Sequence, residues 1–204
     1  MKIVVAQHKG GVGKTTLAVH LAAILSTGRF NKTILVDCDS QGDSFWFFTS
    51  TFPGKPLVTE CGMDDVDVIW NPDREKFSTK ASFDEYRNMV VDIDTRVTNA
   101  LQVIREANPD IVLIPIDNQR LSLEHGKHVI ELLQEEEGTF LYPVRVVFVQ
   151  MGIDWGNEIG YDNFIIPFHE KFDDCFRERD YIWNINDNLE YMSGYFKELV
   201  DYVR

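Results

Sequence analysis

Residues 9–16, with the sequence KGGVGKTT, directly follow a short apolar run typical of a strand and directly precede an apolar stretch with helical spacing. Glycines in such a loop let successive backbone N–H groups turn inward, because no Cβ blocks them. The helix that follows adds its free N-terminal donors and its dipole. Lys14 supplies a positive charge for phosphates, and the Thr15 hydroxyl is a ligand for Mg²⁺. The sequence therefore predicts a phosphate-binding loop.

This loop departs from the ordinary phosphate-loop pattern, G-x-x-x-x-G-K-[ST], at its first position. His8 stands where that pattern has glycine, and an additional lysine, Lys9, follows it. A second cation beside a triphosphate needs the phosphate charge to offset its own desolvation. The alternative, a glycine-rich turn with solvated lysines, is disfavoured because strand, glycines, lysine and paired threonines occur in the expected order.

The sequence KGGVGKTT resembles the deviant Walker A motif of the ParA/MinD family of ATPases. In that family the first lysine reaches across a nucleotide-sandwich dimer to the phosphates of the partner. The resemblance therefore implies that Lys9 of one copy completes the site of another. It also implies that residues 121–126 begin a helix at the dimer face, and it weakens after about residue 135.

A second cluster of polar residues, 37–43 (DCDSQGD), follows the apolar run 33–36. Ligands collect at strand ends of open parallel sheets, so these aspartates can reach a metal-bound water or a phosphate. The segment resembles the family's D-x-D-P-Q-G sequence, with Ser40 where proline is common. The resemblance implies that Asp39 orients the attacking water and that Asp37 lies near Thr15 and the water shell of the metal. A polar turn closing a strand is the alternative interpretation.

A third candidate, Asp92, ends the apolar run 89–91. An aspartate at the end of a buried strand is the Walker B arrangement, in which the carboxylate holds Mg²⁺ directly or through water. The family commonly continues D-x-P-P, whereas this chain reads DIDTR over residues 92–96. Without those prolines, the resemblance does not define the conformation of the loop after Asp92. Asp94 is either an additional carboxylate beside the metal or a helix N-cap ahead of Val97, and we expect the cap.

The family builds its adenine pocket from a strand-end amide and a proline loop, and residues 149–150 and 165–167 fall at those places. Gln150 can donate to and accept from a purine edge, and Pro167 with Phe168 can lie against its face. Ordinary strand-end residues explain these positions equally well.

The predicted site residues form three groups. Catalysis is assigned to Lys9, Lys14 and Asp39. Cofactor binding is assigned to Lys9, Gly10, Gly11, Val12, Gly13, Lys14, Thr15, Thr16, Gln150, Pro167 and Phe168. Metal binding is assigned to Thr15, Asp37 and Asp92, and the cofactors are ATP and Mg²⁺.

The resemblance implies an ATPase that forms an ATP-dependent homodimer and acts as a switch in plasmid or chromosome partition or in cargo positioning. We expect slow hydrolysis without a stimulating partner protein, because nothing in the chain resembles an arginine finger. The alternatives are a metabolic ligase or synthetase on the same fold, a reductase of nitrogenase type and a membrane- or conjugation-associated positioning ATPase. The reductase needs cysteines that bridge a dimer, and the spacing of Cys38, Cys61 and Cys175 does not offer them.

Short β-branched runs at 3–6, 33–36, 89–91, 111–114 and 144–149 alternate with stretches of helical spacing. This alternation predicts an α/β, three-layer P-loop NTPase fold, with a mostly parallel central sheet flanked by helices, in a single domain over residues 1–204. Glycines and prolines break up residues 50–80, which we interpret as a surface connection with one possible edge strand at 66–70. The apolar face of residues 186–204 favours a helix packed on the domain rather than a membrane-targeting helix.

The formal net charge is −13, and the second half of the chain carries nearly all of the acidic excess. Nonspecific DNA binding depends on Lys and Arg, so DNA is a disfavoured partner. No apolar stretch approaches the roughly 20 residues of a transmembrane helix. The three cysteines indicate free thiols in a reducing cytoplasm, and the basic cluster Lys171, Arg177 and Arg179 is interleaved with acids and indicates a salt-bridged surface helix.

Overall fold

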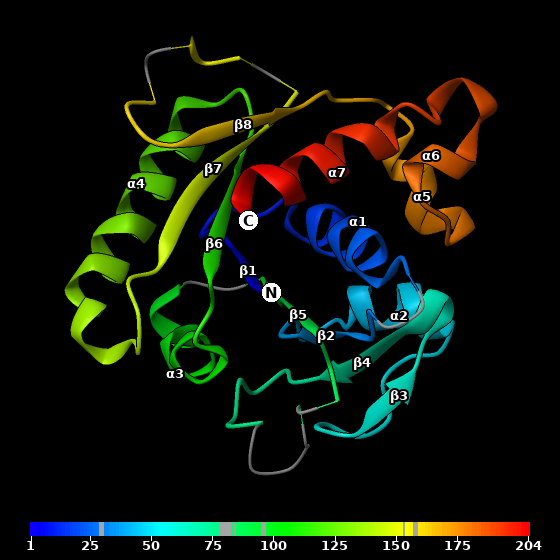
Figure 1. The fold of residues 1–204 in the computed structure, drawn as a ribbon, viewed down its shortest axis with the longest axis horizontal. Coiled ribbons are helices and arrows are strands. Elements are labelled where there is room, and N and C mark those ends of the chain that lie inside the picture. The colour runs from blue at the N-terminus through cyan, green and yellow to red at the C-terminus, as the bar shows by residue number, and fades with distance from the viewer. Residues whose placement is uncertain (29–30, 78–82, 84, 95–96, 153, 157–158) are drawn as a thin grey trace.

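The computed structural model describes residues 1–28, 31–77, 83, 85–94, 97–152, 154–156 and 159–204. Within these residues one eight-stranded sheet has the order β3-β4-β2-β5-β1-β6-β7-β8 (Figure 1). All neighbouring strands are parallel except β3, which is antiparallel to β4. The strands are β1 (Lys2–Ala6), β2 (Thr33–Asp37), β3 (Thr59–Cys61), β4 (Val66–Trp70), β5 (Asn88–Ile93), β6 (Ile111–Ile116), β7 (Arg145–Met151) and β8 (Asn163–Ile166).

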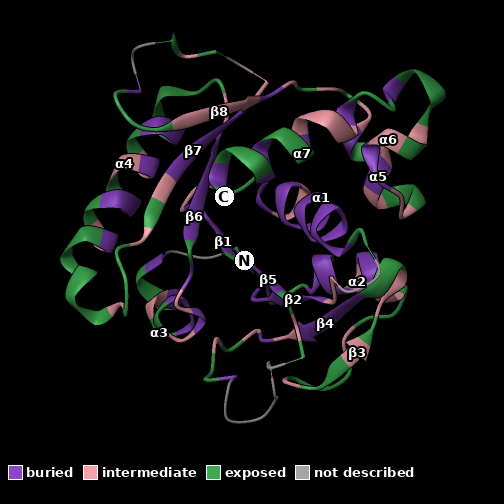
Figure 2. Ribbon diagram, in the orientation of Figure 1, coloured by how far each residue is buried: buried purple, intermediate pink, exposed green. Residues whose placement is uncertain are grey.

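Helices cover both faces of this sheet, as Figure 2 shows by the buried sides that they turn towards it. Alternate residues of each central strand enter opposite cores, because side chains of a strand point alternately to its two faces. One core contains α1 (Lys14–Ser26), α2 (Asp43–Thr49), α5 (Phe172–Glu178), α6 (Ile182–Ile185) and α7 (Met192–Val203). The other contains α3 (Val97–Ala107) and α4 (Arg120–Glu135). The predicted three-layer α/β fold with a mostly parallel sheet is confirmed.

Three short 3-10 helices complete the secondary structure of the described residues: η1 (Met63–Asp65), η2 (Glu137–Thr139) and η4 (Asp187–Leu189). The 50–80 segment is more structured than a surface connection. Its strand at 66–70 is confirmed as β4, but its place at the sheet edge is wrong, because β3 pairs with the outer side of β4. Neither β3 nor β8 was predicted, since runs of three and four partly exposed residues give no clear periodicity.

The C-terminal helix α7 packs on the domain, as predicted. Met192, Phe196, Leu199 and Val203 are buried in the core that α1 shares. The three cysteines are free thiols, two of them buried. No helix in the described ranges is both long and apolar enough to cross a bilayer.

His20 on α1 fixes that helix to the C-terminal region. Its Nδ1 donates to the carbonyl oxygen of Thr16 at 2.7 Å, because its Nε2 accepts the backbone N–H of Ile182 at 3.0 Å. The imidazole is fully buried and stacks on Phe196 with ring centroids 4.9 Å apart. Burial lowers the pKa of His20 to about 4, although the hydrogen bond to Thr16 opposes this shift.

We predict that His20 makes the protein acid-sensitive. The unfolded chain binds a proton here near pH 6.5 and the folded chain only near pH 4, so this stabilisation is complete above pH 6.5 and is lost as the pH falls towards 4. The shift corresponds to about 3 kcal/mol. His20→Gln should flatten the dependence of unfolding free energy on pH across this range, measured by urea denaturation. His128→Gln, at an exposed position of α4, is the matched control, and equal slopes for both variants would contradict the prediction.

A second prediction concerns the close approach of α4 to the sheet. A Cβ at Gly126 would lie 2.3 Å from Phe148 Cε1 and 3.1 Å from Ile114 Cγ2. We expect Gly126→Ala to destabilise the fold by about 1 to 3 kcal/mol through overpacking, despite the better helix propensity of alanine. Gly194→Ala on α7, where nothing lies within 4 Å of the added Cβ, is the control and should be neutral or stabilising by up to about 1 kcal/mol. Thermal denaturation of both variants measures the difference, and equal stabilities would show that α4 can move away.

Candidate functional site

The predicted site residues meet at the carboxyl ends of the central parallel strands. The phosphate loop (residues 9–16) follows β1, residues 37–43 follow β2, and Asp92 lies near the end of β5. A cavity of about 400 Å³ opens there. It is lined by residues 11–16, by Gln41, by three apolar side chains and by five aspartates. The aspartates are Asp39, Asp43, Asp94, Asp117 and Asp173.

The phosphate loop has the strand-loop-helix arrangement that the sequence predicts. Gly11 and Gly13 have φ values of 73° and 90°, which glycine adopts without strain. At Gly13 a Cβ would also lie 3.1 Å from Met151 Cε. Helix α1 begins at Lys14, so its unpaired N-terminal N–H groups border the cavity. The loop can therefore bind an anion through the backbone.

Lys14 is buried and already paired within the chain. Its Nζ donates to the carbonyl oxygen of Lys9 at 2.9 Å and lies 3.1 Å from Asp94 Oδ1. Asp94 thus contacts the lysine that is predicted to bind phosphates. The expected N-cap turn ahead of Val97 involves residues 95–96, which lie outside the described residues, so that role stays a prediction.

Asp92 is fully buried beside the phosphate loop. Ser44 Oγ donates to its Oδ2 at 2.5 Å, whereas its Oδ1 is buried without a hydrogen-bond partner among the described residues. Burial raises the pKa of Asp92 to about 6, and hydrogen bonds from Ser44 and Thr15 limit the shift. The Asp92 Oδ1 atom, which is buried without a hydrogen-bond partner among the described residues, is a suitable ligand for a divalent cation, as is the Thr15 hydroxyl.

The structure also limits how such a cation could be held. Among the described residues, no three His, Cys, Asp or Glu side chains are grouped to bind a metal by themselves. Magnesium bound at Thr15 and Asp92 would need phosphate oxygens and water to complete its shell, which is the usual composition of Mg²⁺ sites with phosphate ligands.

Asp37 is buried next to Asp92, and both of its oxygens accept backbone hydrogen bonds. Asp39 N–H donates to Oδ1 at 2.9 Å and Phe45 N–H donates to Oδ2 at 2.7 Å. Burial and the Asp92 charge raise the pKa of Asp37, against these two hydrogen bonds. Asp37 therefore holds the following loop to the start of α2, and its predicted place in the metal's water shell stays a prediction.

Asp39 lines the cavity and is positioned from two sides. Its Oδ1 accepts the Gln41 N–H at 2.9 Å, and its carbonyl oxygen accepts Trp70 Nε1–H at 2.8 Å. Gly42, with φ of 73°, leaves room for Pro53 and Trp70, since a Cβ would lie 2.7 Å from Pro53 Cγ. The contribution of Trp70 was missed from the sequence, and its only signal is its position at the carboxyl end of a strand.

Lys9 forms an ion pair with Asp117, which directly follows β6. Gln119 N–H donates to Asp117 Oδ1 at 3.0 Å, and Trp155 Nε1–H donates to its carbonyl oxygen at 3.1 Å. Asp117 was also missed from the sequence. Its signal is the one that identified Asp92, an aspartate at the end of a buried β-branched strand.

The structure separates the three residues predicted to contact adenine. Gln150 is buried, and its amide is hydrogen bonded to Asn163 Oδ1 at 2.8 Å and to Trp155 N–H at 2.6 Å. Phe168 lines the cavity and is 67% exposed, whereas Gln150 and Pro167 do not line it. Their roles towards adenine stay predictions.

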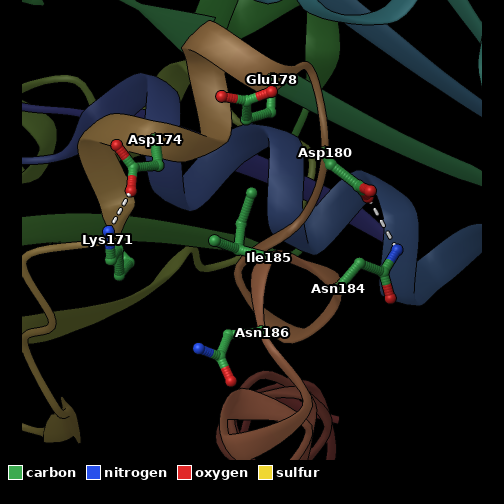
Figure 3. Close-up of a pocket in the computed structure, with 7 residues that line it drawn as sticks. All are labelled: Lys171, Asp174, Glu178, Asp180, Asn184, Ile185 and Asn186. Carbon is green, nitrogen blue, oxygen red and sulfur yellow. Dashed lines mark hydrogen bonds and ion pairs between the residues drawn. The ribbon is translucent and has the colours of Figure 1, made fainter.

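A second cavity of about 400 Å³ lies beside α5 and α6, and none of the predicted site residues lines it (Figure 3). Its polar side chains bind one another: Lys171 Nζ lies 2.7 Å from Asp174 Oδ2, and Asn184 donates to Asp180 at 2.7 Å. Arg177 pairs with Asp174 and Glu178, which confirms the predicted salt bridges for Lys171 and Arg177. Arg179 differs, because its Nε donates to the carbonyl oxygen of Phe47 at 3.0 Å.

A glycine-rich loop between a buried strand and a helix, with aspartates ending the neighbouring strands, defines a P-loop nucleotide-binding protein. The family model CbiA, described as the CobQ/CobB/MinD/ParA nucleotide binding domain, matches residues 3–203. The chain belongs to this family, which includes the ParA and MinD ATPases.

Individual relatives agree with this assignment. The chain is 49% identical over 45 residues to the maintenance of carboxysome distribution protein A of Gloeobacter kilaueensis, covering 22% of this chain and 20% of that protein. It is 50% identical over 42 residues to the chromosome partitioning protein ParA of Myxococcus xanthus, covering 21% of this chain and 14% of that protein. The matched segments thus span a fifth or less of these curated relatives.

Among solved structures, the ATP complex of Cyanothece McdA is similar to this chain with a TM-score of 0.77 and 17% identity. The match covers 98% of this chain and 96% of that chain. At this identity the likeness supports the fold.

The pairing of Lys14 with Asp94 generates a prediction about affinity. Without Mg²⁺, Asp94→Asn should tighten ADP binding by about three- to tenfold, because it removes the carboxylate that competes with phosphate for Lys14. Titration of a fluorescent ADP in EDTA measures this. Asp173→Asn removes the same charge from the cavity wall, where Asp173 has no ion pair among the described residues, and should have a smaller effect. Weaker binding by Asp94→Asn would show that Asp94 supports the nucleotide instead.

Proposed function

We propose that this protein is an Mg-ATP-dependent ATPase that forms an ATP-dependent sandwich dimer and acts as a positioning switch. One observation carries the proposal. Lys14, Thr15 and Asp39 line the same cavity at the N-terminus of α1, and the buried Asp92 contacts Thr15. This arrangement supplies a phosphate cradle, a cation, a carboxylate for water and oxygens for a metal in one place.

Each of these residues has a distinct task in the proposed hydrolysis of ATP to ADP and phosphate. The loop N–H groups and Lys14 hold the β- and γ-phosphates, after Lys14 leaves Asp94. Thr15 and Asp92 would hold Mg²⁺, which neutralises the phosphate charge when bound. Asp39 accepts a hydrogen bond from the attacking water and orients it towards the γ-phosphate. Phe168, which lines the cavity, would pack against the face of the base.

The composition of the cavity wall favours slow hydrolysis by the isolated protein. No arginine lines the cavity among the described residues, so transition-state charge lacks the group that accelerates many P-loop NTPases. We therefore expect a partner protein to stimulate turnover.

Two further observations support the dimer. Lys9 is the additional cation of the loop, and Leu121 at the start of α4 is 57% exposed close to Asp117. An exposed leucine four residues after Asp117, which lines the cavity, suits a face that a second copy covers. Because γ-phosphate contacts exist only before hydrolysis, the dimer would follow the nucleotide state.

The biological role that we propose is positioning of a large cargo or partition of a plasmid or chromosome in the cytoplasm. Support comes from the names of the relatives, which concern carboxysome distribution and chromosome partitioning. The net charge of −13 disfavours nonspecific DNA as the partner.

The test is the mass in solution of Asp39→Ala with Mg-ATP and with Mg-ADP, measured by light scattering. We expect a dimer with ATP, because hydrolysis is blocked, and a monomer with ADP. Adding Lys9→Ala should weaken the ATP dimer by at least about 100-fold, since two lysine–phosphate contacts are lost per dimer.

Lys55→Ala removes an exposed lysine far along the chain from the loop and is the matched control, expected to leave the dimer unchanged. A monomer under saturating ATP would overturn the sandwich dimer. A dimer that fails to remain on added DNA would exclude partition carried by the nucleoid.

A further inference from the structure

Lys9 is engaged within its own chain. Its Nζ pairs with Asp117 Oδ2, and the two side chains are only 17% and 23% exposed. The pair joins the phosphate loop after β1 to the end of β6, the strand beside β1. Asp117 itself lines the nucleotide cavity. Lys9 is expected to contact the nucleotide of a second copy, but here it is paired with Asp117 in the nucleotide cavity of its own chain.

The Asp117 carboxylate is oriented independently of Lys9. Gln119 N–H donates to its Oδ1 at 3.0 Å, which leaves Oδ2 to face the lysine. The backbone of Asp117 is fixed as well, because its N–H donates to Ser122 Oγ at 3.3 Å and its carbonyl accepts Trp155 Nε1–H. An acceptor held in this way costs little further entropy when the lysine binds it.

Lys9 and Lys14 are also linked to each other. The Lys14 ammonium donates to the Lys9 carbonyl oxygen at 2.9 Å and pairs with Asp94. A nucleotide that draws Lys14 towards its phosphates changes the hydrogen bonding at Lys9. The negative charge of a triphosphate beside Asp117 also repels that carboxylate, whose partner is the Lys9 cation.

We propose that Asp117 is a positioning residue that holds Lys9 in its own protomer until a second nucleotide-loaded copy takes it. The free energy needed to break the Lys9–Asp117 pair then raises the dissociation constant of the dimer, and so the protein concentration at which the dimer forms. This inference rests on the proposed ATP dimer and adds its regulation. Two pairs break for each dimer, so an effect of about threefold per pair becomes about tenfold in the dissociation constant.

The experiment measures the dimer dissociation constant by sedimentation velocity with Mg-ATP, in a parent carrying Asp39→Ala. Asp117→Asn keeps an oxygen for the Gln119 N–H but removes the charge, and should lower the constant about tenfold. Asp117→Glu keeps the charge and should restore a constant near that of the parent. Asp117→Ser is a second neutral variant in case the first folds poorly, with folding checked by thermal denaturation.

Two comparisons separate this role from a general effect of charge or structure. Asp173→Asn removes a charge from the same cavity without touching Lys9, and should change the dimer constant less than Asp117→Asn does. ATP affinity, measured at dilutions where only monomer exists, should change equally in both variants, because the pair acts on assembly.

The outcomes are distinguishable. If the Asp39→Ala parent stays monomeric with ATP, the proposed dimer fails and this inference fails with it. If the parent dimerises but Asp117→Asn does so no more tightly than Asp173→Asn, only the role of Asp117 is overturned. Weaker dimerisation by Asp117→Asn together with normal folding would also overturn it, because Asp117 would then support the dimer.

Discussion

The concentration of negative charge at one end of a parallel sheet is the constraint on which this structure depends. Parallel strands end on the same side, so the aspartates that end β2 and β5 and the one that follows β6 come together. Asp37 and Asp92 are both buried there, and burial raises the pKa of each. Such a cluster needs cations, and the phosphate loop provides Lys14 and Lys9 at its border.

The elements that carry this charge are packed between the two cores. Helix α1 is buried along nearly its whole length between the sheet and α7, and His20 fixes it to the start of α6. On the other face, Gly126 brings α4 close to Ile114 of β6 and Phe148 of β7. The phosphate loop and the strand ends are therefore held by both cores, which keeps lysines and carboxylates at short range.

The sequence predicts the layers of the fold and the first set of site residues, because both depend on local patterns. Strand-loop-helix order identifies residues 9–16, and an aspartate ending an apolar run identifies Asp37 and Asp92. What the sequence does not reveal depends on which strands are neighbours. The pairing of Lys9 with Asp117 needs β6 beside β1, and the support of Asp39 by Trp70 needs β4 beside β2.

The position of β4 also depends on its neighbours. A strand flanked by glycines and prolines was assigned to the sheet edge, but pairing with β3 makes it internal.

Gln150 shows a second limit of prediction from sequence. A strand-end amide is a good partner for a purine, but here Asn163 and Trp155 already bind it. Residue type alone cannot tell whether a polar group is available or satisfied within the chain.

Ion pairs within the chain also stabilise the charged groups of the candidate site. Each lysine of the phosphate loop has a carboxylate partner, Asp94 for Lys14 and Asp117 for Lys9, so both cations are paired within the chain. In the proposed ATP dimer, phosphate would replace a carboxylate at each lysine, and the net gain would be the difference between two ion pairs. A small net gain suits a switch, because the bound state is then reversed by the loss of a single phosphate.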